Sequence, residues 1–315
     1  MIGADGKSYA GFLTKGLRRM RAMREQHRVD VHYLEAATAL LQRVRKAHPT
    51  KGLYEAADLQ WWWRTPRSTD SLGQLFWFDQ LGRPEAAVIA TAWGDQMALN
   101  PIVMPDATPE WVAYVIERGL AHASASEFGA IELEVDRADD VLREVLVSHG
   151  FAIKEDGLVE TWLAADARPQ ISSLHEDYRL SSRLDTMLHP HHMVNRSGPD
   201  VAQRLLQTSL YRPELDLLIL DRDDNHVACG LFWYDPETGT GLVEPMLTED
   251  DHQRRGLARH VLTTGIDLLV DAGAERIKIC FELDNAAARG LYLSVGFEPV
   301  KQTDVFSGHA GARAL

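Results

Sequence analysis

Six residues near the C-terminus, Gln253 to Ala258 (QRRGLA), have the composition of an anion-binding loop at the start of a helix. Gly256 lets the backbone approach a ligand closely, and the amides of Arg255 to Arg259 are those that the first turn of a helix leaves unpaired. Such amides favour a phosphate group. An ordinary helix start can have the same sequence, so the neighbouring elements must decide between an anion-binding loop and a helix start without a ligand.

The pattern around the loop indicates a strand before it and an amphipathic helix after it. Leu242 to Thr248 (LVEPMLT) alternates in the manner of a strand. Downstream, apolar and small residues recur at helical spacing: Leu257, Val261, Leu262, Gly265, Leu268, Leu269 and Ala272. The loop therefore lies where a strand passes into a helix.

A second strand and helix continue this order. Arg276 to Leu283 (RIKICFEL) predicts a strand, and Asn285 is a suitable cap for the helix that follows. The anion-binding loop is thus followed by a second motif, Asn285 to Phe297 (NAAARGLYLSVGF). The two motifs stand in the order found in the GNAT superfamily of N-acetyltransferases, and the C-terminal half resembles this superfamily over roughly 140 residues.

The resemblance implies an acetyl-CoA site. The pyrophosphate would bind at the Q/R-x-x-G-x-G/A motif, here Gln253 to Ala258. The residues expected to bind it are Arg254, Arg255, Gly256, Leu257, Ala258 and the adjoining Arg259. The backbone of Met246, Leu247 and Thr248 would pair with the pantetheine arm like an added strand. Asn285, a helix cap first, would also touch this arm.

Transfer of an acetyl group to an amine needs a neutral amine and a proton for the departing thiolate. Side chains alternate along a strand, so Glu244, Met246 and Thr248 are expected on one face, with Glu244 near the acetyl group as a general base acting through water. The alternative role for Glu244 is an ion pair with an arginine. By resemblance, Tyr292 protonates the thiolate; otherwise it is a core aromatic.

Three acids directly before the loop, Glu249, Asp250 and Asp251, bear on this site. If they face solvent, water and salt screen their charge; if they point inward, they weaken the binding of a pyrophosphate.

The N-terminal half repeats the order of elements. Strands expected at Gln74 to Phe78 and Ala86 to Thr91 correspond to Asp216 to Leu220 and Val227 to Trp233, at an offset of about 142 residues. Matched offsets favour duplication over chance similarity. The first copy has MPDATPEW (Met104 to Trp111) in place of the loop, without a glycine or a basic pair, so we expect a degenerate copy with a structural or substrate-shaping role.

The predicted fold class is thus α/β, with two tandem GNAT-like domains that each have a mixed, mostly antiparallel sheet flanked by helices. The expected boundaries are a basic extension over residues 1–29, the degenerate domain over 30–165, a linker over 166–177 and the catalytic domain over 178–315. The extension is interpreted as a solvated helix or frayed tail, with an acidic surface or nucleic acid as the alternative partner.

Trp61, Trp62 and Trp63 lie on a helix expected over residues 54–64 and cannot all face one way. They predict either a packing patch between the domains or a substrate wall.

Composition narrows the partners and the compartment. The formal net charge of −13 argues against general nucleic-acid binding, and no run approaches the roughly 18 apolar residues of a membrane helix. Cys229 and Cys280 are the two cysteines, both in expected strands, which argues against a disulfide framework and favours the cytoplasm. The sequence sets no oligomeric state.

The loop LHPHHM carries His189, His191 and His192. No cysteine or carboxylate stands beside them at ligand spacing, so we expect a solvated loop and no metal.

These features predict an N-acetyltransferase that moves the acetyl group of acetyl-CoA directly to a primary amine of a small molecule, in a ternary complex. The acidic protein would attract a cationic amine. Two alternatives stay open, a non-catalytic module that binds acyl-CoA and a partner protein, and a protein or peptide acetyltransferase. Mycothiol synthases share the tandem plan, but their motif spellings are not specifically matched.

Overall fold

The computed structural model describes residues 23–124 and 128–309, which form two compact units. Unit 1 contains residues 23–54, 67–155 and 304–309 of this part, and unit 2 contains residues 55–66 and 156–303. No helix of the described part is long and apolar enough to cross a membrane.

The units exchange segments relative to the boundaries expected from the sequence. The short helix α3 (Ala56–Trp62) precedes most of unit 1 in the chain but belongs to unit 2. Strands β6 (Ala152–Ala164) and β12 (Glu298–Gly308) each contribute residues to both units. Trp61 and Trp62 of α3, and Trp63 at its C-cap, therefore belong to unit 2.

Unit 1 is a mixed sheet with helices. Its strands follow the order β1 (Arg24–Arg28), β2 (Gln74–Phe78), β3 (Pro84–Trp93), β4 (Gln96–Val103) and β5 (Ala130–Asp136), with β12 beside β5. The first four strands are antiparallel, and β5 runs parallel to β4. The helices are α2 (Asp30–Ala47), α4 (Pro109–Ala123) and α5 (Asp140–Ser148).

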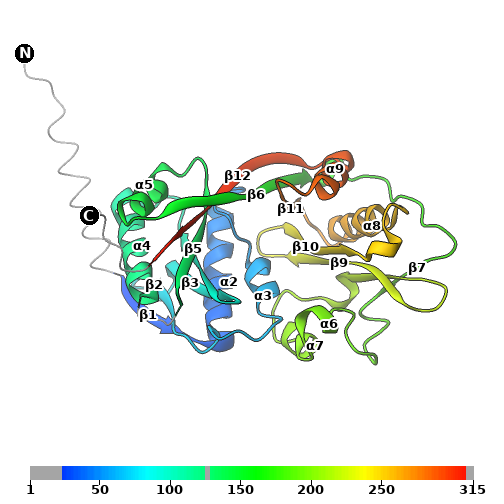
Figure 1. Cartoon of the computed structure of the whole chain (residues 1–315), viewed down its shortest axis with the longest axis horizontal. Coiled ribbons are helices and arrows are strands. Elements are labelled where there is room, and N and C mark those ends of the chain that lie inside the picture. Colours follow the sequence, from blue (N-terminus) through cyan, green and yellow to red (C-terminus); the bar gives the residue numbers. More distant parts are fainter. Residues whose placement is uncertain (1–22, 125–127, 310–315) are drawn as a thin grey trace, which may run out of the picture. The chain divides into compact units, whose positions relative to one another are not determined.

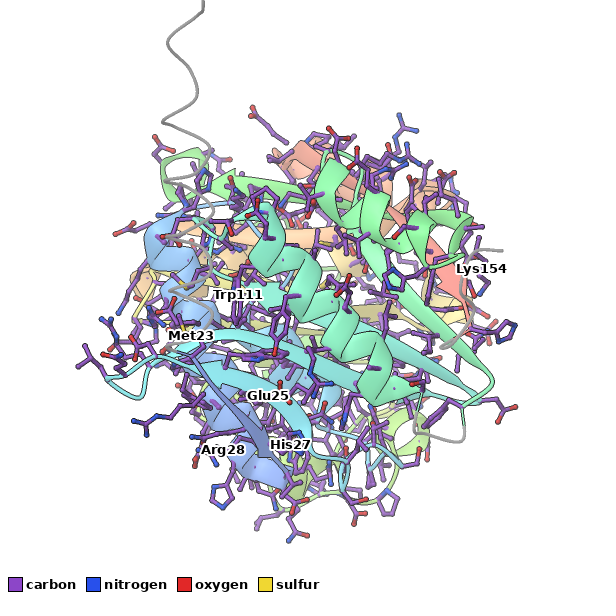
Figure 2. All side chains as sticks on the ribbon, turned by 90° about the vertical axis from the view of Figure 1, so that its left-hand side faces the viewer. Met23, Glu25, His27, Arg28, Trp111 and Lys154 are labelled. Carbon is purple, nitrogen blue, oxygen red and sulfur yellow. The ribbon has the colours of Figure 1, made fainter. Side chains whose placement is uncertain are left out.

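Aromatic packing holds α4 on this sheet. The indole of Trp77 on β2 meets Trp111 edge-on, with ring centroids 5.9 Å apart. Gly119 brings α4 close to β3, because a Cβ there would lie 2.9 Å from a methyl of Val88. Figure 2 shows α4, with Trp111, crossing the face of the sheet, and Glu25 and His27 on β1.

Unit 2 repeats this plan in the strand order β6, β11 (Arg276–Glu282), β10 (Thr240–Thr248), β9 (His226–Asp235), β8 (Asp216–Leu220) and β7 (Arg179–Ser182), with β12 beside β6. Its helices besides α3 are α6 (Val194–Ser197), α7 (Val201–Leu205), α8 (Leu257–Asp271) and α9 (Ala286–Val295). Single 3-10 turns occur at Ala165–Ala167, Pro213–Leu215 and Asp250–His252.

Helix α8 covers β9 and β10, as Figure 1 shows. Gly265 of α8 makes room for the ring of Phe232 on β9, since a Cβ there would lie 2.1 Å from the Phe232 ring. Val261, Leu262, Ile266 and Leu269 complete the buried stripe of the helix. This packing fixes the start of α8 beside the end of β10.

The structure confirms the mixed α/β fold, and β2 and β8 have the bounds expected from the sequence. One expectation for the basic extension is wrong at its end. Arg24–Arg28 is a strand, not a helix or frayed tail, because its backbone pairs with β2 from Arg24 opposite Phe78 to Arg28 opposite Gln74. The remaining basic residues, Lys15 to Arg21, lie outside the described residues.

Candidate active site

Two neighbouring parallel strands of unit 2 separate where the candidate site begins. The parallel register of β10 with β11 comprises three pairs and ends with Leu242 opposite Lys278. Strand β10 runs on to Thr248 and β11 to Glu282, each still paired with its other neighbour. Backbone groups along the parted edges are therefore available to an extended ligand that adds like a strand.

The loop after β10 has the backbone that the sequence motif predicts. Gly256, the N-cap of α8, has φ of +81°, and Arg254 two residues earlier also has a positive φ of 60°. No described side chain caps this helix start, and no heavy atom lies within 4 Å of a Cβ built on Gly256. No described side chain therefore satisfies the first amides of α8, which leaves them available to a phosphate group.

The side chains of the motif divide between the surface and the core. Arg255 donates hydrogen bonds to the hydroxyl of Tyr178 at 2.7 Å and to the carbonyl of Asp251 at 2.9 Å, and Arg259 donates to Ser294. Leu257 is buried in the core of the unit, so only its backbone can reach a ligand. The structure brings the motif residues together around one exposed loop.

The three acids before the loop do not point into the core. Asp250 and Asp251 are exposed, and an Asp250 carboxylate oxygen accepts a hydrogen bond from the Gln253 amide at 2.9 Å. Both oxygens of Glu249 lie 3.0 Å from a guanidinium nitrogen of Arg196. Solvent and this ion pair therefore screen their charge from the loop.

A β-bulge changes the direction of the side chains on β10. Val243 pairs with Phe232 and Met246 with Gly230, so one extra residue of β10 lies between these pairs. Both Val243 and Met246 pack toward α8; a Cβ on Gly230 would meet the Met246 sulfur and Val261. Glu244 follows Val243 and accepts a hydrogen bond from Trp61 instead. The expectation that Glu244 and Met246 share one face is wrong, because the bulge breaks the period-two alternation.

Glu244 has the properties of a base that works near neutral pH. Burial, and next the negative charge of Asp58, raise the pKa of its carboxyl group to about 7, against the opposing effects of Arg64 and the Trp61 hydrogen bond. A carboxylate with this pKa accepts a proton readily at neutral pH. The indole of Trp61 is stacked under the Arg64 guanidinium, 3.6 Å from the ring centroid.

Tyr292 of α9 is nearly buried, and burial, the charge of Glu244 and that of Cys280 raise the pKa of its phenol above the ordinary value. A raised pKa keeps the hydroxyl protonated at every physiological pH. At neutral pH Tyr292 therefore holds a proton, whereas Glu244 is able to take one. Full transfer of the Tyr292 proton costs more than for an exposed phenol, which favours a hydrogen-bond donor role.

A buried polar cluster beside Glu244 was not predicted from the sequence. Lys278 Nζ lies 3.2 Å from Glu160 Oε2 and 3.6 Å from Glu55 Oε1. Asp58 caps α3 by accepting a hydrogen bond from the Glu55 amide at 2.6 Å, and burial raises the pKa of Asp58 to about 6. One signal was available: Lys278 and Cys280 alternate with Ile277 and Ile279 on β11, which places polar groups on one face of a buried strand.

Asn285 caps α9 through its side chain, which accepts a hydrogen bond from the Ala288 amide at 3.0 Å. The structure thus shows the capping role that the sequence predicts for Asn285 first.

Unit 1 contains the corresponding parting of strands but a different helix start. The parallel register of β4 with β5 ends with Ala98 opposite Glu132. Helix α4 begins after Thr108, whose hydroxyl accepts the Trp111 amide at 3.3 Å, so one amide of this start is already satisfied. A cavity of about 510 Å³ lies here and is lined by apolar residues and acids, including Val103, Ala107, Glu134 and Asp139.

The histidine loop differs from its expected state. His189 is exposed as predicted, but His191 is buried and the side chain of His192 is only 5% exposed, so the expectation of a solvated loop is wrong for these two. The cause is Asp216, whose carboxylate oxygens lie 3.0 Å from His191 Nε2 and 3.2 Å from His192 Nε2.

Comparison with known proteins accounts for this architecture. Residues 174–297 match the acetyltransferase (GNAT) family. The C-terminal half is a GNAT acetyltransferase domain. Two mycothiol acetyltransferases are similar to the chain, that of Beutenbergia cavernae with 31% identity over 90 residues and that of Clavibacter michiganensis subsp. michiganensis with 35% over 81 residues. The matches span 29% and 26% of this chain, and 30% and 26% of those proteins.

Solved structures extend the GNAT fold to both halves. A tandem GNAT protein from the clavulanic acid biosynthesis pathway has a TM-score of 0.67 at 10% identity and covers 92% of this chain and 99% of its own. A GCN5-related N-acetyltransferase from Sphaerobacter thermophilus has a TM-score of 0.57 at 16% identity, covering 92% and 96%. The fold is therefore a tandem GNAT fold.

Proposed function

We propose that this GNAT protein transfers the acetyl group of acetyl-CoA to a primary amine of a small molecule, at the site in unit 2 where β10 leaves β11. One observation carries the proposal: directly after the last pair, Leu242 and Lys278, stands Glu244 with a pKa of about 7, and β10 leads from there to the uncapped start of α8. The proposed base thus lies on β10, and the proposed phosphate loop follows the end of the same strand.

The residues present fit the cofactor. The parted edge of β10 at Met246, Leu247 and Thr248 offers backbone to the pantetheine arm, and the first amides of α8 at Gly256 offer donors to the pyrophosphate. The arginines Arg254, Arg255 and Arg259 add positive charge around the same loop. Asn285 is assigned here to the arm as well as to its cap.

Acetyl-CoA supplies a thioester, so transfer forms a C–N bond, breaks the C–S bond and moves two protons. Glu244 takes the proton of the attacking ammonium, directly or through water, because its carboxylate is the conjugate base of an acid with a pKa of about 7. Tyr292 keeps its proton and donates a hydrogen bond to the departing sulfur, and the second proton that the nitrogen loses as the amide forms passes to this thiolate. Transfer is direct, without an acyl-enzyme.

The acceptor is proposed to be a cationic small amine. Burial raises the pKa values of both Asp58 and Glu244, and this supports a site that favours an added positive charge. An ammonium group would supply this positive charge. The similarity to mycothiol acetyltransferases, which are named for a small molecule, supports the same class of acceptor.

The test measures free thiol released from acetyl-CoA across a panel of polyamines, amino sugars and amino-acid amides, with lysine peptides as a second panel. We expect release that depends on a small amine, with an acetylated product of the corresponding mass. Acetyl-CoA binding without amine-dependent release would contradict the proposal in favour of a binding module. Preference for the peptides would favour a protein or peptide acetyltransferase.

A further inference from the structure

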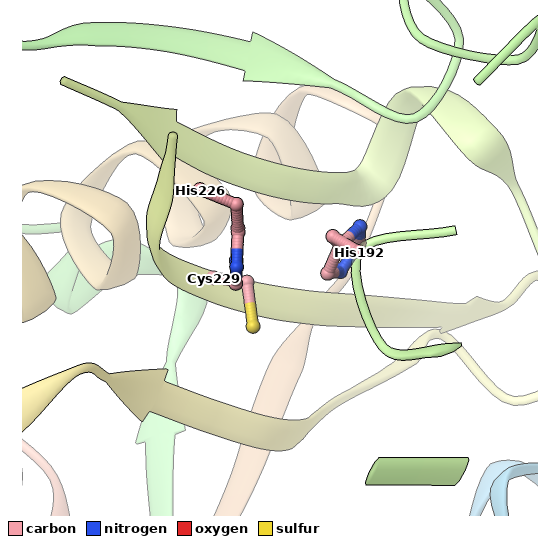
Figure 3. A group of neighbouring side chains, drawn as sticks. All are labelled: His192, His226 and Cys229. Carbon is pink, nitrogen blue, oxygen red and sulfur yellow. The ribbon is translucent and has the colours of Figure 1, made fainter. Parts of the chain in front are cut away.

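Three potential metal ligands converge in unit 2 away from Glu244. His192 comes from the loop before α6, and His226 and Cys229 come from β9 (Figure 3). One ligand atom from each of the three lies within 4.8 Å of the others. The ring centroids of His192 and His226 are 5.0 Å apart.

A bulge in β9 brings His226 and Cys229 together. Residues three apart on a regular strand face opposite sides. Here Ile219 pairs with Ala228 but Leu220 pairs with His226, so one extra residue of β9 lies between the pairs. Such a bulge redirects a side chain, and it places His226 on the side of Cys229.

His192 has surroundings like those of a metal-binding imidazole. Its side chain is only 5% exposed, and Nε2 lies 3.2 Å from Asp216 Oδ1. Its other nitrogen, Nδ1, is buried and has no hydrogen-bond partner in the described structure. A carboxylate behind one nitrogen of a histidine, with the other nitrogen directed at the ion, is the common second-sphere arrangement of metal sites.

His226 repeats this pattern. A hydrogen bond to the backbone of Ala228 engages its ring, while Nε2 is buried without a hydrogen-bond partner among the described residues. Leaving two buried imidazole nitrogens unpaired costs free energy, which a shared ion would recover. His191 is not a fourth ligand, because its Nε2 contacts Asp216 and its Nδ1 accepts a hydrogen bond from the Met193 amide at 3.1 Å.

Cys229 supplies the soft donor. The residue is 1% exposed, and its sulfur lies 3.9 Å from the thioether sulfur of Met193. The cluster meets a hollow of about 710 Å³ that is lined by His192, His226 and Glu249 among others, which provides a path for an ion from solvent.

We propose that His192, His226 and Cys229 bind one thiophilic d¹⁰ ion, Zn²⁺ or Cu⁺, that ties the loop before α6 to β9. Two imidazoles and a thiolate suit both ions. Binding breaks the S–H bond of Cys229, forms a metal–sulfur bond and releases the proton to solvent. Metal bonds of roughly 2.0–2.3 Å draw the three ligand atoms together by about 1 Å through side-chain rotation. The Met193 sulfur beside the site adds a soft donor that favours Cu⁺.

The experiment uses the full chain, stripped with a chelator and titrated separately with Zn²⁺ in air and with Cu⁺ under anaerobic conditions. We expect one tightly bound equivalent of at least one ion, measured by elemental analysis after desalting, and a thiolate-to-metal charge-transfer band when Co²⁺ replaces Zn²⁺. Less than about a tenth of an equivalent of both ions would overturn the proposal.

Variants assign the ligands. Cys229→Ser and His226→Gln should each lower the affinity for the metal ion by at least roughly 10–100-fold. Removal of a residue that only supports a ligand already has an effect of this size. The matched control, Cys280→Ser, removes the other cysteine and should bind as the unaltered protein does. Unchanged affinity in both Cys229→Ser and His226→Gln would overturn the assignment. Should these variants fail to fold, the titration and the Co²⁺ spectrum of the unaltered protein still decide.

Discussion

After burial, the negative charge of Asp58 is what most raises the pKa of the Glu244 carboxyl group, although the two residues come from distant parts of the chain. Asp58 stands on α3, which belongs to unit 2 and directs Trp61 to the same carboxylate. Together with burial, this repulsion gives Glu244 its pKa of about 7. A helix outside the GNAT-matched segment, residues 174–297, thus contributes, after burial, to the strength of the proposed base.

The first prediction concerns the pH dependence of acetyl transfer. Because Glu244 must be ionised to accept a proton, kcat/KM should rise with pH and level off above a midpoint of about 7. Asp58→Asn removes the repelling charge, so this midpoint should move to lower pH while the profile keeps its shape. A midpoint that stays in place would show that Asp58 does not tune the base.

The second prediction concerns stability. A carboxyl group whose pKa rises from 4.5 to about 7 on folding binds more protons in the native state, so its contribution is present below pH 4.5 and is lost as the pH rises through 7. The free energy of unfolding should therefore fall between pH 5 and 8. Glu244→Gln should remove roughly 3 kcal/mol of this fall. Urea unfolding at both pH values measures it, and an equal fall in both proteins would refute the raised pKa.

The sequence predicts the order of elements well because hydrophobic periodicity and helix-boundary residues are local signals. The strand before the loop, Gly256 at the start of α8 and the Asn285 cap are all in place. Two features could not be read locally. The bulge between Val243 and Met246 reverses the expected facing of Glu244, and only tertiary contacts show it.

The neighbours of Glu244 are the second such feature. Asp58 and Trp61 reach it from α3, and no spacing in the sequence relates them. Nor does any short motif in the sequence indicate that His192 lies near Cys229, because the two residues come from separate segments of the chain.

The third prediction concerns Tyr292. Its phenol stays protonated because its pKa is raised, so the activity of the unaltered enzyme should show no decline from Tyr292 ionisation up to about pH 10. Tyr292→Phe removes the donor and should lower kcat by roughly 100-fold, with little change in acetyl-CoA affinity. Steady-state rates from pH 6 to 10 test this, and an unaltered kcat would exclude Tyr292 as the hydrogen-bond donor to the departing sulfur.

The fourth prediction separates the two roles of Asn285. Asn285→Ala removes the cap that binds the Ala288 amide and should cost about 1 kcal/mol of stability, whereas Asn285→Asp retains a capping oxygen and should cost less. Thermal unfolding compares them. If Asn285 also touches the pantetheine arm, acetyl-CoA affinity should fall in both variants; an affinity that is unaltered in both would leave the cap as the sole role.

A calorimetric titration of the full chain directly tests where acetyl-CoA binds. Gly256→Glu adds a carboxylate to the phosphate loop. The new Cβ meets no neighbouring atom, so the cost to the stability of the fold is only the roughly 1–2 kcal/mol of placing a Cβ in the left-handed conformation. Its control is Ala107→Glu, in the corresponding loop and cavity of unit 1. We predict one acetyl-CoA per chain in the unaltered protein and in Ala107→Glu, and none in Gly256→Glu. Binding retained in Gly256→Glu and lost in Ala107→Glu would contradict the account.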